Sequence, residues 1–162
     1  MFRKILVPYD TSKPASNAAR YAAQLAKSSE RDCEIILVHV VPHIQASPVV
    51  LDRPLRSKKG ETIMLSEYFK QLYEEMQDNA AKTLDKKKKE IEVEAGGKAK
   101  VGTIVLIGDS VSGKILELAE KDNVDLIIIG NVGLSGISKL KTLGSVSRAV
   151  SERSPCPVLI VH

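Results

Sequence analysis

Five short apolar runs, separated by segments with helical periodicity, constrain the fold of this chain more than any other feature of its sequence. Their residues are almost continuously apolar and do not alternate with polar ones. This pattern is typical of parallel strands that helices cover on both faces. We therefore predict an α/β protein, a three-layer sandwich with a five-stranded parallel sheet. The predicted strands are Ile5–Val7, Glu34–Val41, Val101–Ile107, Val124–Ile129 and Val158–Val161.

Helical periodicity accounts for most of the sequence between these runs. The first helix is expected to begin after Thr11 or Ser12, either of which can act as its N-cap. Its apolar residues recur at the spacing of one helix face, at Ala15, Ala18, Ala22 and Leu25. Ser110 and Gly144 are expected to precede two further helices, and the second of these ends near Arg153.

Residues 42–60 interrupt this alternation of strands and helices. Three prolines and one glycine punctuate a stretch that has few periodic apolar positions. The composition predicts an extended connection or a mobile flap. A chain of 162 residues has the size of one compact domain, so we expect a single domain over residues 1–162 with a flexible insertion near 42–60.

A long helix is predicted over residues 61–95, before two glycines end it. Four consecutive lysines, residues 86–89, are expected to form a solvated face of this helix. The pairs Asp85–Lys89 and Lys86–Glu90 have the i,i+4 spacing that supports ion pairs on a helix. The expected inner face of the helix consists of Ile63, Phe69, Leu72, Met76, Leu84 and Ile91.

Composition excludes several classes of function. The net charge is only +4, there is no Trp and aromatic residues make up 4% of the chain, so binding to nucleic acid is not indicated. No apolar run is long enough to span a membrane, and the N-terminal sequence has no secretory pattern, so we expect a cytoplasmic protein. Cys33 and Cys156 are isolated, which gives no support to a zinc site or a disulfide framework.

A glycine-rich segment after the fourth predicted strand is the most distinctive candidate for a binding site. Ligands of parallel α/β sheets bind beyond the carboxyl ends of the strands. Here Gly130, Gly133 and Gly136 open a loop that closes at Gly144 and Ser145, where a helix is expected to begin. Glycines allow a phosphate to approach the backbone, and a helix N-terminus attracts anions. The alternative is that these glycines only form turns and cap the helix.

The sequence resembles the universal stress protein family, in particular its ATP-binding branch, over nearly the whole chain. Residues 4–10 resemble the opening strand and acidic turn of the family, 37–40 its second strand and 154–161 its closing strand. The family motif G-x2-G-x9-G-[ST] is matched at its fixed positions by Gly130, Gly133, Gly144 and Ser145. In this chain ten residues, one more than in the motif, separate the second glycine from the third.

The resemblance implies a strand order of 3-2-1-4-5 and a binding site for ATP, AMP or ADP with Mg²⁺. Asp10 would contact adenosine, Val40 would line the adenine slot, and a phosphate cradle would come from the backbone after Gly133. Asn131 stands where the family usually has Ser or another small residue. The implied site residues are Pro8, Tyr9, Asp10, Val40, Ile129, Gly130, Gly133, Gly144, Ser145, Val146 and Ser147.

A second loop, Gly108–Lys114, matches the G-x4-G-K part of a phosphate-binding P-loop. The residue after it is Ile115, where a P-loop needs Ser or Thr to hold Mg²⁺. The alternative is a purely structural role, in which the segment caps a helix and Lys114 points into solvent.

We therefore expect an ATP-binding stress-response regulator or chaperone-like switch that forms a homodimer through its last strand, Pro157–Val161. No catalytic residue is assigned, and any ATP hydrolysis is expected to be slow or to need a partner. Two alternatives stay open. One is a dimer that binds no nucleotide and acts only through protein interactions, and the other is an NTPase that uses the Gly108–Lys114 loop.

Overall fold

The computed structural model describes residues 2–56, 60–134 and 143–162, and its centre is the predicted parallel sheet. The strand order is β5-β2-β1-β6-β7, which is the expected order of third, second, first, fourth and fifth strand. All four pairings in this sheet are parallel. The fold class and the strand order are therefore confirmed. The strands are β1 (Lys4–Pro8), β2 (Cys33–Pro42), β5 (Ala99–Gly108), β6 (Leu126–Gly130) and β7 (Val158–Val161).

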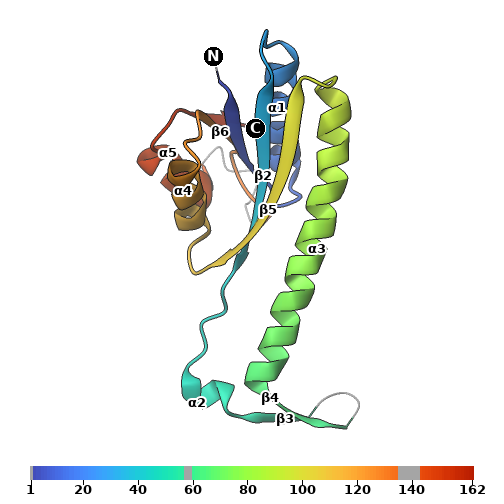
Figure 1. The fold of residues 1–162 in the computed structure, drawn as a ribbon. Helices are drawn as coiled ribbons and strands as arrows, with labels where there is room; N and C mark the ends of the chain where they lie inside the picture. The colour runs from blue at the N-terminus through green and yellow to red at the C-terminus, as the bar shows by residue number, and fades with distance from the viewer. Residues whose placement is uncertain (1, 57–59, 135–142) are drawn as a thin grey trace.

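Helices cover both faces of the sheet (Figure 1), as the continuous hydrophobicity of the strands predicts. The helices α1 (Lys13–Lys27) and α3 (Leu65–Glu94) lie on one face, and α4 (Val111–Lys121) and α5 (Ser145–Arg153) lie on the other. Each face has its own hydrophobic core. Neighbouring residues of one strand, such as Leu37 and Val38 of β2, belong to opposite cores, so both must be apolar.

The first helix packs closely on the sheet because its buried residues are alanines. Ser12 is the N-cap, and its Oγ accepts a hydrogen bond of 3.2 Å from the backbone N–H of Ala15. Leu25 is 39% exposed and does not belong to the inner face; Ala26 completes that face instead. The buried residues of α1 are Ala15, Ala18, Ala19, Ala22, Ala23 and Ala26.

Regular structure extends into the segment that was expected to be an extended connection. It contains the short helix α2 (Pro48–Leu51) and β3 (Pro54–Arg56), and β3 pairs antiparallel with β4 (Thr62–Met64). The long helix begins at Leu65 and not near residue 61, because β4 occupies the intervening residues. These elements and the N-terminal half of α3 project beyond the sheet (Figure 1). We call this projection, residues 43–56 and 60–76, the arm.

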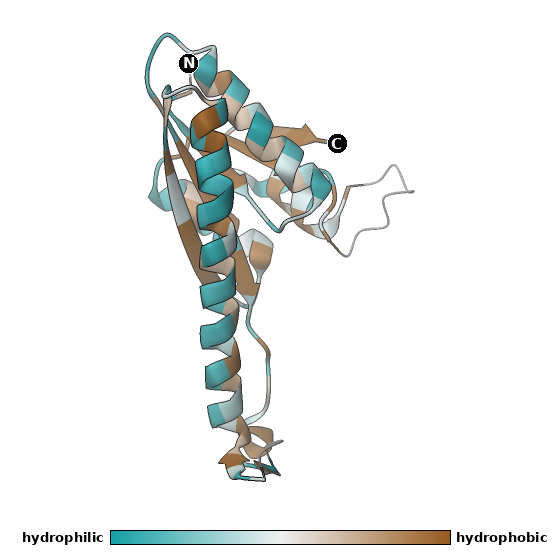
Figure 2. Ribbon diagram, turned by 90° about the vertical axis from the view of Figure 1, so that its right-hand side faces the viewer, coloured by the Kyte–Doolittle hydropathy of each residue, from teal (hydrophilic) through white to brown (hydrophobic). Residues whose placement is uncertain are grey.

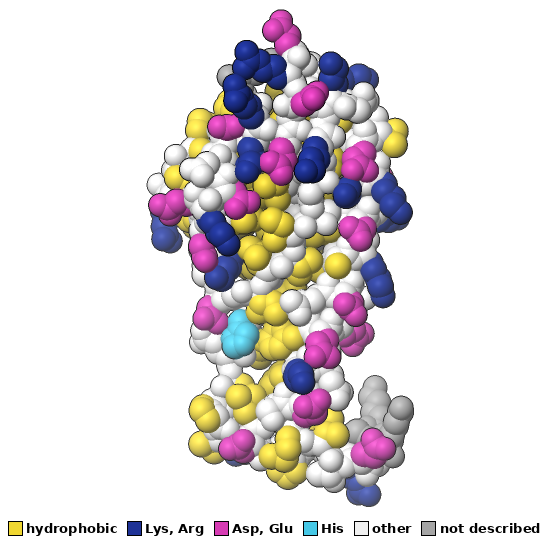
Figure 3. Space-filling model, in the orientation of Figure 1, with side chains coloured by type: hydrophobic (Ala, Val, Ile, Leu, Met, Phe, Trp, Pro, Cys, Tyr) yellow, Lys and Arg dark blue, Asp and Glu magenta, His cyan; other side chains and the backbone are white. Residues whose placement is uncertain are grey.

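The arm changes the burial that the periodicity of α3 predicts. Leu84 and Ile91 pack on the sheet and are buried as expected. The other four residues of the predicted inner face are only half-buried, because they lie on the arm. Apolar residues also recur along the arm (Figure 2), and a space-filling view shows apolar side chains on its surface over α2, β3 and β4 (Figure 3). The exposed ones are Ile44, Val49, Val50, Leu55, Met64 and Tyr68.

The lysines of α3 do not all lie in solvent. Neither predicted ion pair, Asp85–Lys89 or Lys86–Glu90, occurs among the contacts of the described residues. Instead, Lys88 Nζ lies 3.8 Å from Glu92 Oε1, and Asp85 accepts a hydrogen bond from Thr103. Lys87 pairs with Glu90, and its side chain is only 13% exposed. Charged residues recur along α3, and none of the helices in the described part of the chain is apolar over enough residues to cross a membrane.

The last residue of β6, Gly130, contacts the first turn of α1 so closely that only glycine fits. A Cβ atom at this position would lie 2.8 Å from the carbonyl carbon and the Cβ of Pro14. We expect Gly130→Ala to lower the free energy of unfolding by about 1–3 kcal/mol, because the backbone must shift. Gly102→Ala is the matched control, since nothing lies within 4 Å of its added Cβ. Urea unfolding measures both, and equal losses would contradict this packing.

Candidate functional site

A cavity of about 500 Å³ opens beyond the carboxyl ends of β1, β2 and β6. This is the edge at which α/β sheets bind their ligands, and the volume is in the range of small-molecule sites. All eleven site residues expected from the sequence line it, although they come from four separate parts of the chain. Their contacts with a nucleotide stay a prediction. The residues are Pro8, Tyr9, Asp10, Val40, Ile129, Gly130, Gly133, Gly144, Ser145, Val146 and Ser147.

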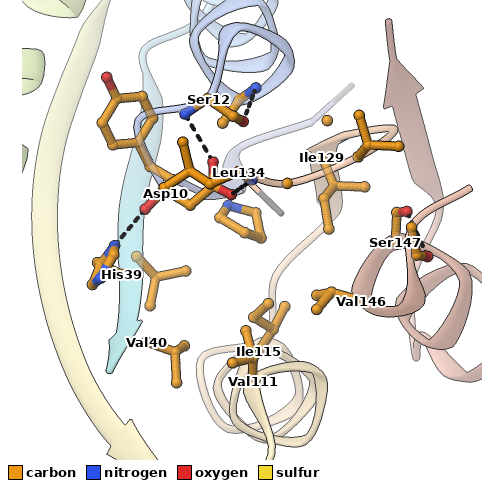
Figure 4. Close-up of a pocket in the computed structure, with 18 of the residues that line it drawn as sticks. Asp10, Ser12, His39, Val40, Val111, Ile115, Ile129, Leu134, Val146 and Ser147 are labelled. Carbon is orange, nitrogen blue, oxygen red and sulfur yellow. Dashed lines mark hydrogen bonds between the residues drawn. The ribbon is translucent and has the colours of Figure 1, made fainter. Parts of the chain in front are cut away.

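The walls of the cavity are mostly apolar. The side chains of Val40, Ile129 and Val146 surround the open centre together with Val111 and Ile115 of α4 (Figure 4). Val111 and Ile115 have the spacing of a buried helix face, but they are not among the site residues expected from the sequence. Their contribution follows from the direction in which α4 crosses the sheet, which periodicity does not encode. Eight lining residues were missed in all: Ser12, Ala15, Val38, His39, Val111, Ile115, Val132 and Leu134.

Val40 presents a backbone donor and a backbone acceptor toward the cavity. In β2 the even-numbered residues bond to β1: Glu34 N–H donates to the carbonyl of Arg3, and the carbonyl of Val38 accepts from Tyr9 N–H. The strand β1 ends at Pro8, so the N–H and C=O of Val40, which point the same way, extend past it. No group in the described residues bonds to them.

Asp10 connects the two loops that border the cavity. Its Oδ1 accepts a 3.0 Å hydrogen bond from the backbone N–H of Ser12, and its Oδ2 accepts a 3.0 Å bond from that of Leu134. A Cβ atom at Gly133 would lie 2.7 Å from Oδ2, so glycine permits this approach. Each carboxylate oxygen keeps a further lone pair for a ligand. His39 also lies at this rim, where its Nδ1 is 2.8 Å from the carbonyl oxygen of Tyr9.

The N-terminus of α5 opens into the same cavity. Its N-cap is Gly144, and in the described part of the chain no side chain bonds to the N–H groups of the first turn. The first intrahelical bond runs from Arg148 N–H to Gly144 O, which leaves the N–H groups of residues 145–147 without a backbone acceptor there. Such a turn carries a partial positive charge that favours anions.

The hydroxyl of Ser147, one of the implied site residues, bonds to backbone carbonyl groups of the protein. Its Oγ donates to the carbonyl oxygen of Asn131 at 2.6 Å and lies 3.0 Å from that of Gly144. The N–H of Gly144 also donates to Asn131 O at 2.8 Å, so the two ends of the glycine-rich loop meet here. Gly136 and the extra residue of the motif fall in 135–142, outside the described residues.

The competing P-loop-like segment forms the capped start of α4. Ser110 Oγ accepts a 3.1 Å hydrogen bond from Gly113 N–H, and Lys114 Nζ donates to Glu117 Oε2 at 2.7 Å. The Lys114 hydrogen bond lowers the pKa of the exposed Glu117 carboxyl. The stem of Lys114 lies over Gly108, where an added Cβ would be 2.5 Å from its Cγ. Of this segment only Val111 lines the cavity, and Lys114 contacts a residue of its own helix instead.

No group of three or more His, Cys, Asp or Glu side chains that could hold a metal ion occurs in residues 2–56, 60–134 and 143–162. Cys33 is buried, and burial raises the pKa of its thiol, while Cys156 is only half-buried. A divalent ion in the cavity would therefore depend mainly on ligand oxygens, as Mg²⁺ does when it binds together with phosphates.

Comparisons with known proteins agree on one family. The model of the universal stress protein family matches residues 1–162. A universal stress protein of Methanocaldococcus jannaschii is 35% identical over 161 residues, which cover 99% of this chain and 82% of the relative. The universal stress protein YxiE of Bacillus subtilis is 32% identical over 162 residues and is covered completely, as is this chain.

Solved structures share the fold. A second Methanocaldococcus jannaschii protein superposes with a TM-score of 0.77 at 27% identity, covering 99% of this chain and 96% of the other. A universal stress protein of Archaeoglobus fulgidus in complex with dAMP has a TM-score of 0.64 at 20% identity, with 99% and 98% covered. An Arabidopsis thaliana family protein with AMP bound has a TM-score of 0.61 at 19% identity, with 98% and 90% covered.

The bond from Ser147 to Asn131 gives a stability prediction. Ser147→Ala removes a buried hydroxyl donor, so we expect the free energy of unfolding to fall by about 1 kcal/mol. Ser145→Ala is the matched control, because Ser145 is exposed and its hydroxyl has no hydrogen bond to the described residues. Thermal or urea unfolding distinguishes the two variants. A loss of stability for Ser145→Ala as large as that for Ser147→Ala would contradict this role.

Proposed function

Because the chain belongs to the universal stress protein family, we propose that it binds an adenine nucleotide in the cavity beyond β1, β2 and β6. One observation carries the proposal. A single cavity joins an apolar slot to a helix N-terminus. The backbone N–H and C=O of Val40 in the slot, and the first three N–H groups of the helix, have no hydrogen-bond partner among the described residues. The first end suits a flat purine base, and the second suits phosphates.

Each part of the nucleotide has a complementary part of the cavity in this proposal. The C=O and N–H of Val40 match the N6 amine and the N1 acceptor of adenine, and the valines and isoleucines enclose the ring. Asp10 contacts the adenosine, and Ile129 and Gly130 lie beside the ribose. The backbone N–H groups of residues 145–147, with Gly133 and Gly144, bind the phosphates. The chain thus contributes mostly backbone groups and apolar contacts.

The similar folds that hold adenine nucleotides support this choice of ligand. Structures of family members contain AMP, dAMP and, in a further case, cAMP. We propose ATP with Mg²⁺ as the ligand of this chain, and the ion is held by the phosphate oxygens. Nucleotide occupancy then acts as the signal of a stress-response regulator or chaperone-like switch, because a ligand favours the conformation that it binds.

Binding of ATP is the direct test. After bound nucleotide has been stripped from the purified protein, calorimetric titration with ATP and Mg²⁺ should give one site per chain. We expect Gly144→Val to weaken binding at least about tenfold, because an added Cβ would already lie 3.3 Å from Val132 Cα, and the larger side chain covers the phosphate end. Lys114→Ala is the control and should bind as the wild type does. The reverse pattern would favour the P-loop alternative, and no binding would favour the interaction-only dimer.

The same titration with GTP tests the role assigned to Val40. Guanine carries an acceptor at O6 and a donor at N1, so it opposes the donor and acceptor of Val40 with groups of the same kind. We expect GTP to bind at least about tenfold more weakly than ATP, since buried polar groups are left unpaired. Equal affinities for ATP and GTP would contradict the placement of the base beside Val40.

We also propose that the chain forms a homodimer through β7. This strand lies at an edge of the sheet, with Leu159 37% exposed, and pairing with a second copy covers its free backbone groups. Sedimentation velocity should show a dimer that Leu159→Lys converts to a monomer. Lys100→Glu, on the opposite edge strand β5, is the control and should leave the dimer intact. A monomeric wild type, or a dimer that only the β5 variant breaks, would refute this interface.

A further inference from the structure

The turn that carries Asp10 holds a backbone conformation that depends on its surroundings. Thr11, between Asp10 and Ser12, has a φ of 70°, in the left-handed region that a β-branched residue rarely adopts. Such a conformation costs free energy and persists only where neighbouring contacts over-determine it. The contacts that hold this turn therefore also decide where the Asp10 carboxylate lies.

Three elements of the fold supply hydrogen bonds to the turn. From β2, Val38 O accepts from Tyr9 N–H at 2.8 Å, and His39 Nδ1 lies 2.8 Å from Tyr9 O. At the start of α1, Ser12 N–H donates to Asp10 Oδ1. From the loop after β6, Leu134 N–H donates to Asp10 Oδ2. Each of these contacts is made by a group at or beside the cavity.

A further contact comes from a fourth element, α3, which does not line the cavity. The Nζ of Lys87 lies 5.5 Å from the centre of the Tyr9 ring, within the range of a cation–π interaction. Tyr9 as a whole is only 7% exposed, and its hydroxyl is 3.4 Å from Ser16 Oγ. Nζ also donates to Glu90 Oε2 at 2.6 Å, which fixes the ammonium above the ring.

The ammonium of Lys87 keeps its charge in this half-enclosed place. Burial by itself would lower the pKa of Lys87, but the hydrogen bond and charge of Glu90 and the neighbouring Tyr9 outweigh burial and raise it above the ordinary value. A lysine that is 13% exposed in a run of otherwise solvated lysines thus has a defined partner. Its aromatic partner, Tyr9, directly precedes Asp10 in the chain.

We propose that Lys87 is a positioning residue for the nucleotide site: its ammonium holds the Tyr9 ring, and the ring holds the strained turn that aims the Asp10 carboxylate. The inference rests on the proposed function for its effect on nucleotide affinity, but not for its effect on the turn. It connects the site to α3, whose N-terminal half forms part of the arm. Substitution of Lys87 should change the affinities for adenosine and for ATP by the same factor, because Asp10 contacts the nucleoside part of both ligands.

The test compares Lys87→Met with Lys89→Met. Methionine keeps the apolar stem and removes the charge, and Glu90 is 50% exposed, so no buried carboxylate is left unpaired. We expect Lys87→Met to weaken the binding of adenosine and of ATP by the same factor, about fivefold. This factor corresponds to the free energy of a partly desolvated cation–π contact. Exchange of the Leu134 amide hydrogen, which is bonded to Asp10, should speed up by about the same factor. Lys87→Arg should restore both, and Lys89→Met, at an exposed position, should change neither.

The outcomes separate this inference from the proposed function. If the wild type binds no nucleotide, the proposed function fails, and the Leu134 exchange rate still decides the role of Lys87. If Lys87→Met lowers the melting temperature but leaves nucleotide affinity and Leu134 exchange at their wild-type values, Lys87 only stabilises the fold and the inference is wrong. A loss of affinity for ATP without a loss of affinity for adenosine would also overturn the inference, because the effect would then lie at the phosphates.

Discussion

The close approach of α1 to the end of β6 is the constraint on which the rest of the site depends. Gly130 has no side chain, and the buried face of α1 consists of alanines, so the backbones of helix and strand come together at Pro14. This contact places the turn before α1 next to the loop after β6. The bond from Leu134 N–H to Asp10 Oδ2 then joins two segments that are 124 residues apart in the sequence.

A second group, the carbonyl oxygen of Asn131, closes the opposite side of the cavity. It accepts from Gly144 N–H and from Ser147 Oγ, and these bonds hold the start of α5 beside the end of β6. The residues of the first turn of α5 consequently line the cavity. A helix N-terminus can bind an anion with groups that every residue type carries, so anion binding here would depend on backbone placement more than on particular side chains.

Much of this architecture was predictable from the sequence. Apolar runs located all five strands of the parallel sheet, because a strand covered on both faces must be apolar throughout. The resemblance to the family supplied the strand order and eleven residues, such as Asp10 and Val146, that the fold brings to one cavity. The boundaries were less accurate: β6 begins at Leu126, and the long helix begins at Leu65. Local pairing, as between β3 and β4, shifts such ends without changing the pattern.

Other features could not be read from the pattern. Val111 and Ile115 have the periodicity of any buried helix face, and only the crossing of α4 over the sheet turns them toward the cavity. The bond from Ser147 Oγ to Asn131 O joins residues sixteen positions apart, and no sequence pattern indicates it. In the arm, four residues with core periodicity remain half-buried because the arm projects beyond the sheet (Figure 1).

By itself, the sequence determined which segments form the parallel sheet, that helices follow Thr11 or Ser12 and Ser110, and which glycines follow the fourth strand. These follow from local properties: hydrophobicity, capping hydrogen bonds and the freedom of a residue without a side chain. Only the tertiary structure decided that one lysine of four lies over Tyr9 and that the backbone of Val40 faces an open cavity. Both depend on where a neighbouring element ends or crosses, and that is set by packing between distant parts of the chain.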